Sequence, residues 1–282
     1  MQKKFIFLDI DGTLMDFQGR IPESARKALE LAKAAGHRLI ICTGRTKSEI
    51  YPELLQMDFD GIIGAAGAYV ECDGKEVYRH VVESSQLNKL LNCFEENQIT
   101  YCLQTGTGVI MTPRNRDGFR DYFLSIGLEE ATIWKVLSAE LILEDDSRMR
   151  KNVEKAAYYG SHIFAETIQE VIGDYFKVEG ASYGSNTVCN GEITCTGETK
   201  ATGIQRYIDY IGVDISDTIG IGDGLNDVDM LSKTAIAVAM GNARKATKAI
   251  ADYITDDVDK DGLWKAFKHL DLIYESVRRV ST

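Results

Sequence analysis

The sequence has little of what marks secreted, zinc-binding or membrane proteins. Its 282 residues include three prolines and four histidines, and its six cysteines form no C-x-x-C pair. Scattered cysteines are typical of reduced thiols rather than of zinc ligands or a disulfide framework. No apolar run approaches the roughly 20 residues of a membrane helix. The run that starts at Phe5 ends at Asp9, short of the roughly 7–15 apolar residues of a signal peptide. We therefore expect a cytoplasmic protein that binds no membrane.

Positive charge is also scarce. The chain has 43 acidic and 32 basic residues, which gives a formal net charge of −11. This balance argues against nucleic acid as a partner, but it says little about small ligands, because a local site can be positive on an acidic protein. The length allows a core domain and a second module, and the 44% hydrophobic content is ordinary for a globular protein. Nothing in the sequence indicates an oligomeric state.

Short apolar runs alternate with helical patterns at both ends of the chain. Phe5–Leu8, Arg38–Cys42 and Gly61–Gly64 are typical of buried strands, a helix is expected over 22–35, and another is expected to run through Leu55. The C-terminal third repeats this rhythm, with expected helices at 203–211, 228–231 and 243–251 and expected strands at 218–221 and 235–239. The alternation predicts an α/β protein with a Rossmann-like parallel sheet.

The middle of the chain has a different pattern. It combines an expected helix at 86–95 with short strands at 109–111 and 141–143. We predict that residues 82–191 form an α+β module inserted into a core that consists of residues 1–81 and 192–282.

Asp9 and Asp11 follow the first expected strand, and three further polar segments follow at Thr43-Gly44, Lys200 and Gly222 to Asp227. In open α/β sheets, ligands bind outside the carboxyl ends of strands. The two-residue period places the Asp9 and Asp11 carboxylates on one side of the chain, where they would repel each other without a cation. Such a pair suits magnesium, which prefers oxygen ligands. Two solvated aspartates in a turn are the alternative.

The other three segments are each ambiguous by themselves. Thr43 and the Gly44 amide form an anion cradle or an ordinary helix cap. Lys200, at the expected start of a helix, needs an anionic partner there unless it is a solvated surface lysine. Asp223, Asn226 and Asp227 concentrate acidic groups directly after a buried strand, which a metal would offset. Jointly, in this order and at strand ends, the segments are specific.

These residues resemble the haloacid dehalogenase (HAD) superfamily, and within it the Cof-type hydrolases. The family's D-x-D-G-T, Thr/Ser-Gly-Arg and G-D-x-x-N-D motifs match Asp9 to Thr13, Thr43 to Arg45 and Gly222 to Asp227, and its lysine matches Lys200. The similarity continues through Ala237 to Ala243 and Ala251-Asp252. The chain departs from the family where Ala65-Ala66-Gly67-Ala68 replaces Asn-Gly-Ala and where Glu198-Thr199 precedes the lysine.

The resemblance implies a phosphatase that acts on a small phosphorylated metabolite and uses Mg²⁺. Asp9 would be the nucleophile and Asp11 the general acid and base. The metal would be held by Asp9, the backbone carbonyl of Asp11 and Asp223, with Asp227 orienting these ligands. The expected phosphate-binding residues are Thr43, Gly44, Lys200 and Asn226. The inserted module would act as a cap domain that selects the leaving group, with Arg114, Arg116 and Tyr183 as candidates, although each is more commonly a solvated surface residue.

Two other functions stay open at this point. A phosphotransferase or phosphomutase would pass the same aspartyl-phosphate to a sugar hydroxyl instead of water. A non-catalytic sensor would bind a phosphorylated ligand, but it would not need a second carboxylate placed for proton transfer.

Overall fold

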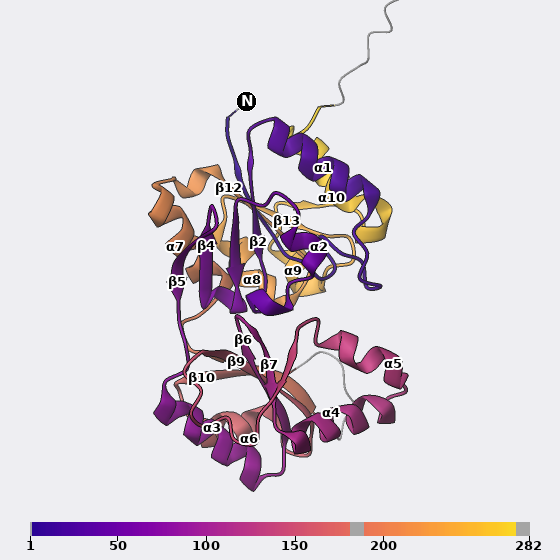
Figure 1. Cartoon of the computed structure of the whole chain (residues 1–282). Helices are drawn as coiled ribbons and strands as arrows, with labels where there is room; N and C mark the ends of the chain where they lie inside the picture. Colours follow the sequence, from indigo (N-terminus) through magenta and orange to yellow (C-terminus); the bar gives the residue numbers. More distant parts are fainter. Residues whose placement is uncertain (1, 181–188, 275–282) are drawn as a thin grey trace, which may run out of the picture.

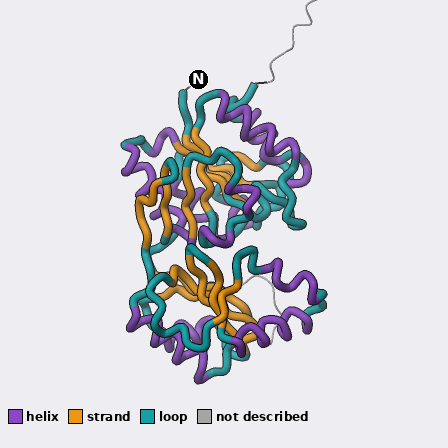
Figure 2. The backbone as a smooth tube through the Cα atoms, viewed as in Figure 1, coloured by secondary structure: helices purple, strands orange, loops and turns teal. Residues whose placement is uncertain are grey.

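The computed structural model describes residues 2–180 and 189–274, which form two sheets (Figure 1). The larger sheet has the strand order β14-β13-β12-β1-β2-β3-β4-β5, with strands from both ends of the chain. The smaller sheet has the order β10-β11-β9-β6-β7-β8 and comes from the middle of the chain. We call the two parts the core and the inserted module. Figure 2 shows the two sheets one above the other, each with helices around it.

Strand β1 (Phe5–Leu8) lies in the centre of the core, paired in parallel with β2 (Arg38–Cys42) and β12 (Thr218–Gly222). The parallel sheet continues through β3 (Gly61–Gly64), β13 (Ile236–Ala239) and β14 (Tyr253–Ile254), and β4 (Tyr69–Cys72) and β5 (Lys75–Arg79) add an antiparallel edge. The carboxyl ends of the parallel strands therefore meet at one edge of the sheet.

Helices cover both faces of the core sheet. Ile6 and Leu8 point to the face covered by α1 (Glu23–Ala34) and α10 (Gly262–His269). Phe5 and Phe7 point to the opposite face, which is covered by α7 (Lys200–Ile211) and α8 (Val228–Lys233). Because both faces are buried, the successive residues of β1 are all apolar. The sequence pattern therefore predicted the α/β core correctly.

The expected helix through Leu55 is wrong over most of its length. The segment instead forms a 3₁₀ turn, η1 (Lys47–Glu49), and a four-residue helix, α2 (Pro52–Leu55). Tyr51 is extended between them (φ −53°, ψ 132°) because a residue before proline is sterically excluded from the helical region. The last expected helix is also shorter, since α9 spans only Lys245–Ala249.

The inserted module packs helices α3 (Ser84–Glu96) and α6 (Ala165–Ile172) on one face of its sheet, and α4 (Pro113–Ser125) and α5 (Glu130–Ile133) on part of the other face. Its strands are β6 (Thr100–Thr105), β7 (Gly108–Met111), β8 (Leu141–Leu143), β9 (Val153–Ser161), β10 (Phe176–Gly180) and β11 (Cys189–Cys195). Further 3₁₀ turns are η2 (Ala65–Gly67), η3 (Trp134–Val136), η4 (Ile215–Asp217), η5 (Leu225–Asp227) and η6 (Val258–Lys260).

The expected boundary between residues 191 and 192 falls inside β11. This strand pairs with β9 and β10 of the smaller sheet, with pairs as far along the strand as Cys195. The strand shows little alternation of buried and exposed residues, so the sequence pattern does not indicate where it begins and ends. No helix within residues 2–180 and 189–274 is long and apolar enough to cross a membrane.

The inserted module contacts the core directly at the carboxyl edge of the larger sheet. The Ser48 hydroxyl donates to the Thr105 carbonyl oxygen at 2.6 Å, and the Gln104 amide donates to the Glu49 carboxylate at 2.6 Å. Both core residues lie in η1, the turn after β2. The module therefore lies over the edge where the polar strand-end segments converge.

Candidate active site

Lys200 brings the two halves of the core together at the edge of the sheet. Its ammonium group donates to Asp9 Oδ1 at 2.6 Å and also to Asp227 Oδ1. All three side chains are buried, with exposed fractions of 1% for Lys200, 7% for Asp9 and 0% for Asp227. These residues are far apart in the chain, so the sheet places them together as the sequence predicts.

Asp227 organises the loop after β12. Its Oδ2 atom accepts the backbone N–H groups of Asp223 at 2.9 Å and Gly224 at 2.8 Å, while Oδ1 accepts Lys200. A Cβ atom on Gly222 would lie 2.5 Å from the Asp227 carboxyl carbon, so glycine is required for this close approach. Both oxygens of Asp227 are therefore occupied by protein donors.

The Asp223 side chain packs against the loop that follows β1, at Gly12. A Cβ atom on Gly12, whose φ is +83°, would lie 2.4 Å from Asp223 Oδ2. The Asn242 amide bridges the two loops, donating to the Gly12 carbonyl oxygen at 2.9 Å and to Asp223 Oδ2 at 3.1 Å. The sequence motifs do not mark Asn242 as a site residue, although it lies in the Ala237 to Ala243 segment that carries part of the family resemblance.

Asp9, Asp223 and Asp227 form a carboxylate cluster that could hold a metal ion, because one oxygen of each lies within 4.8 Å of the others. Burial and the Asp227 charge raise the pKa of Asp9 well above its usual value, and the same two causes raise the pKa of Asp223 to about 7. Burial alone would lower the pKa of Lys200, but the charges of Asp227 and Asp9 raise it. The cluster therefore has more negative charge than Lys200 offsets. Its oxygen ligands fit a hard divalent cation such as Mg²⁺.

The Asp11 side chain does not join this cluster. It is half-exposed and forms a two-point ion pair with Arg45, at 2.7 Å to Nε and 2.9 Å to Nη2. The guanidinium also donates to the Tyr51 hydroxyl at 3.1 Å and lies over the Tyr51 ring. Arg45 belongs to the Thr43 to Arg45 motif but was not among the expected site residues. Its position two residues after Thr43 was the available signal.

Thr43, Gly44 and Asn226 lie at the same edge of the sheet. Thr43 is buried, and its hydroxyl accepts the Arg45 N–H at 3.2 Å. A Cβ atom on Gly44 would lie 3.6 Å from Asn226 Nδ2, so the two loops face each other. No helix starts at Gly44, and the expected helix-terminal cradle is therefore replaced by a turn that ends in η1.

The turn after β3 packs against the start of α7, next to Lys200. Ala65 and Ala66 have φ values of +49° and +54°, a left-handed conformation that asparagine and glycine adopt more readily. The next residue, Gly67, packs so closely on α7 that a Cβ atom there would lie 2.0 Å from the Thr199 carbonyl oxygen. The departure from the family's Asn-Gly-Ala pattern thus falls on a strained turn below Lys200.

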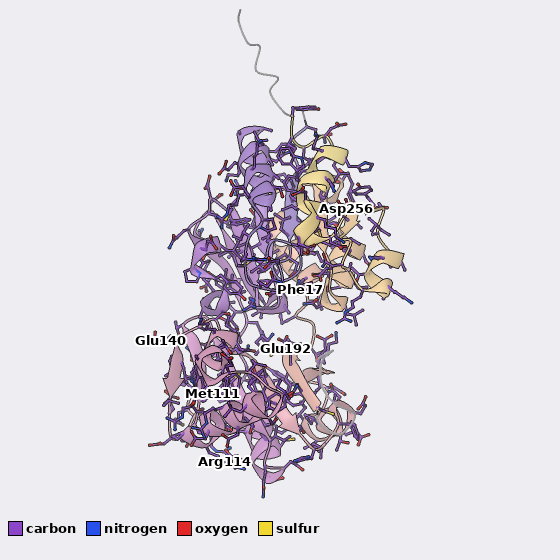
Figure 3. All side chains as sticks on the ribbon, turned by 90° about the vertical axis from the view of Figure 1, so that its right-hand side faces the viewer. Phe17, Met111, Arg114, Glu140, Glu192 and Asp256 are labelled. Carbon is purple, nitrogen blue, oxygen red and sulfur yellow. The ribbon has the colours of Figure 1, made fainter. Side chains whose placement is uncertain are left out.

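The inserted module contributes Lys155 from β9 and Glu192 from β11 to this edge. Figure 3 shows Glu192 at the end of the module next to the core, and Arg114 at the opposite end. Arg114 is therefore wrong as a candidate for leaving-group selection. Arg116 pairs with its neighbour Asp117 on α4, and Tyr183 lies outside the described residues.

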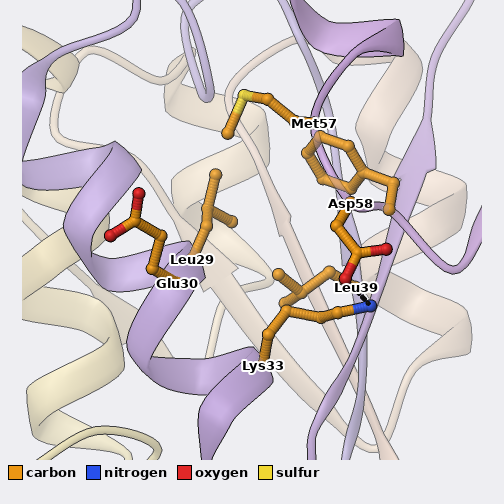
Figure 4. A pocket seen from close by; sticks show the side chains of 7 residues that line it. Leu29, Glu30, Lys33, Leu39, Met57 and Asp58 are labelled. Carbon is orange, nitrogen blue, oxygen red and sulfur yellow. Dashed lines mark ion pairs between the residues drawn. The ribbon is translucent and has the colours of Figure 1, made fainter.

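A separate pocket of the core lies beside α1, β2 and residues 57–59 (Figure 4). Its lining residues are Leu29, Glu30, Lys33, Leu39, Met57, Asp58 and Phe59. Lys33 at its rim pairs with Asp58 at 3.2 Å and with Asp60 at 3.0 Å. The pocket has no contact with the carboxylate cluster, and we assign it no chemistry.

Comparison with known proteins identifies the family. Residues 6–267 match the haloacid dehalogenase-like hydrolases. The chain is 29% identical to a putative phosphatase, YkrA, of Bacillus subtilis over 97% of this chain and 100% of that protein. It is 26% identical to the phosphatase YwpJ of the same organism over 95% and 99%. A solved sugar phosphatase of HAD subclass IIB superposes with a TM-score of 0.80 and 28% identity, over 96% of this chain and 100% of that one.

The chain therefore belongs to the haloacid dehalogenase-like hydrolases. These matches confirm the predicted family resemblance, the α/β fold with an inserted cap module, and the enzyme class of phosphatase.

Proposed function

We propose that this enzyme hydrolyses a small phosphorylated metabolite, a sugar phosphate or a similar phosphomonoester, with Mg²⁺ and through an aspartyl-phosphate on Asp9. The observation that carries the proposal is the position of Asp9 at the strand edge. Lys200 holds one of its oxygens, and no described residue donates to the other, Oδ2. The names of the relatives, which include phosphatases and a sugar phosphatase, support the same reaction.

In the first step, an Asp9 oxygen attacks phosphorus, and the bond between phosphorus and the leaving oxygen breaks. The leaving alkoxide takes a proton from Asp11. In the second step, water attacks the phosphorus of the aspartyl-phosphate and gives a proton back to Asp11, while the bond between phosphorus and the Asp9 oxygen breaks. This releases inorganic phosphate and restores the Asp9 carboxylate and the protonated Asp11. Asp11 must exchange its contact with Arg45 for one with the leaving oxygen, and its half-exposed position leaves room for this change.

The charge in the site explains why a cation is needed. Two unit charges 4 Å apart repel by roughly 4 kcal/mol at an effective dielectric constant of 20, so a carboxylate that meets a phosphate dianion faces about 8 kcal/mol. Asp9, Asp223 and the backbone carbonyl of Asp11 would hold Mg²⁺, which offsets this repulsion when bound. Lys200 places a second positive charge on Asp9, fixed within the buried cluster.

Thr43, the Gly44 amide, Lys200 and Asn226 would bind the phosphoryl oxygens. The proximity of Gly44 and Asn226 supports this assignment, since the two approach the same space from different loops. Asp227 would orient the loop that carries Asp223, because its own oxygens already accept three protein donors. The inserted module would close the site against bulk water.

The substitution Asp9→Asn tests the nucleophile. We expect phosphate release from p-nitrophenyl phosphate to fall by at least about 1000-fold while the circular dichroism spectrum stays unchanged. Asp217→Asn, a surface carboxylate paired with Lys4, is the matched control and should keep full activity. Residual activity of Asp9→Asn within tenfold of wild type would contradict the proposal.

Two further measurements define the reaction. Excess chelator should stop turnover, and added Mg²⁺ should restore it; turnover that survives chelation would remove the metal from the proposal. Measuring inorganic phosphate against phosphorylated sugar products, with a free sugar present as acceptor, separates hydrolysis from phosphotransfer. We expect inorganic phosphate to account for the substrate consumed.

A further inference from the structure

An ion pair of the inserted module, between the buried Lys155 and the half-exposed Glu192, forms part of the wall of the proposed site. Lys155 has a side chain that is only 1% exposed, and its ammonium group donates to Glu192 Oε2 at 2.5 Å. The same ammonium donates across to the core, to the Gly44 carbonyl oxygen at 3.0 Å. Lys155 thus has one partner on its own sheet and one in the turn where the phosphoryl group is proposed to bind.

The Glu192 carboxylate faces the substrate space. A Cβ atom on Gly44 would lie 4.0 Å from Glu192 Oε2 and 3.6 Å from Asn226 Nδ2, so these groups surround a common volume. The Glu192 side chain is 52% exposed, and no described residue donates to its second oxygen, Oε1. Figure 3 shows Glu192 at the core-facing end of the module. The carboxylate therefore offers a hydrogen-bond acceptor to a molecule in the site.

The charge of this wall differs from that of a site built for a second anion. Lys155 is paired with Glu192, Arg45 with Asp11, and Lys200 with Asp9 and Asp227. Each of these three cations is therefore already matched by at least one carboxylate. A second phosphate or carboxylate on the leaving group would meet the Glu192 charge, whereas a hydroxyl group would donate to it.

We propose that Glu192, held by Lys155, selects leaving groups that are neutral and carry hydroxyl groups, and rejects those with a second anionic group. This inference rests on the proposed phosphatase function and names the substrate class of that site. Glu192 acts as a specificity-determining residue, and Lys155 acts through it as a positioning residue.

The test compares leaving groups. The wild-type enzyme is assayed with p-nitrophenyl phosphate, with neutral sugar monophosphates (glucose 6-phosphate, fructose 6-phosphate and ribose 5-phosphate), and with fructose 1,6-bisphosphate and 6-phosphogluconate. We expect kcat/KM for the best neutral sugar phosphate to exceed that for both anionic sugars by at least about 10-fold. The inference would be overturned if kcat/KM for the anionic sugars equalled or exceeded that for the neutral sugar phosphates. If the enzyme still hydrolysed p-nitrophenyl phosphate, the phosphatase proposal would stay intact. No turnover of any substrate would instead contradict the phosphatase proposal.

Variants then assign the preference to Glu192. Glu192→Ala should lower kcat/KM for neutral sugar phosphates at least about 10-fold more than for p-nitrophenyl phosphate, because that substrate has no hydroxyl donors. Glu192→Gln should reduce the discrimination against anionic sugars to within about threefold, and Glu192→Asp should keep it. Glu144→Gln, which changes a glutamate paired with Arg150 elsewhere in the module, should leave all ratios as in wild type. Equal effects of Glu192→Ala on all substrates would overturn the assignment.

Discussion

The core and the inserted module each bury one lysine at the site, and the two lysines are compensated differently. Lys200 of the core lies between two buried carboxylates, Asp9 and Asp227, which belong to the same sheet edge. Lys155 of the module pairs with the half-exposed Glu192, and its second partner is a carbonyl oxygen of the other body, at Gly44. Both partners of Lys200 belong to the core, so its ion pairs do not depend on the position of the module. One partner of Lys155 belongs to the core, so its hydrogen bonds depend on contact between the two parts.

This difference matches a division of labour. Chemistry at phosphorus needs charges whose positions do not change, and the rigid end of a parallel sheet provides them. Under the proposed function, selection of the leaving group would fall to side chains of the inserted module, which is a separate body that meets the site from outside the sheet. Loss of Lys200 should therefore affect every substrate, and loss of Lys155 should affect substrates according to their leaving group.

The largest effect is expected for Lys200→Met. It removes the cation from between two carboxylates, so kcat should fall at least about 1000-fold with p-nitrophenyl phosphate and sugar phosphates alike. Loss of one partner of a buried pair also costs about 3–5 kcal/mol of unfolding free energy, measurable by urea denaturation. Lys155→Met should reduce activity unevenly between these substrates. If Lys200→Met instead lowered kcat to different extents for the different substrates, the proposed difference between the two lysines would be wrong.

Asp11→Asn comes next and separates the two chemical steps. A sugar alkoxide leaves poorly without a proton, so sugar phosphate hydrolysis should fall by about 100- to 10,000-fold. p-Nitrophenolate needs no proton, so rapid mixing should still show a burst of about one equivalent before the second step stalls. A burst that is absent, with unchanged steady-state turnover, would show that Asp11 plays no acid–base role.

Asp223→Asn tests the excess negative charge of the core site. The pKa of Asp223 is raised to about 7, so its contribution to metal-free stability is present below its unfolded value of 3.8 and is lost as the pH rises through 7. Metal-free Asp223→Asn should therefore be more stable than wild type at pH 8, by about 1–2 kcal/mol, and similar to it near pH 4. Thermal denaturation in chelator checks this.

The same variant should respond differently to the metal. Mg²⁺ should raise the melting temperature of wild type at pH 8 and have little effect on Asp223→Asn, since a ligand is lost. Asp217→Asn serves as the surface control. An unchanged Mg²⁺ response in Asp223→Asn would exclude this carboxylate as a ligand.

The smallest effect is expected in the strained turn behind Lys200. Ala66 has a φ of +54°, which glycine adopts without the steric cost that alanine has there. Ala66→Gly should stabilise the protein by about 0.5–1 kcal/mol, after the greater entropy of glycine in the unfolded chain is subtracted. Urea denaturation provides the measurement, with Ala68→Gly, at a helical φ of −69°, as a destabilising control.

The core site could be predicted because its residues follow continuous apolar strands. The apolar run of β1 ends at Asp9, and that of β12 ends just before Asp223, so the local pattern indicates both the strand and the polar groups after it. Arg45 and Asn242 were not recognised as site residues, since their roles depend on contacts with Asp11 and with Gly12 and Asp223, across the sheet edge. The cytoplasmic location and the absence of a nucleic-acid partner stay predictions.

Local periodicity and short motifs are sufficient to predict the parallel core, the family, and the set of acidic and basic groups at the strand ends. The pairing of Asp11 with Arg45, and the presence of Lys155 and Glu192 rather than Arg114 at the site, follow from the three-dimensional arrangement. The sequence of a strand in the module indicates which residues share a face, but the face that meets the core is set by how two separate bodies pack together.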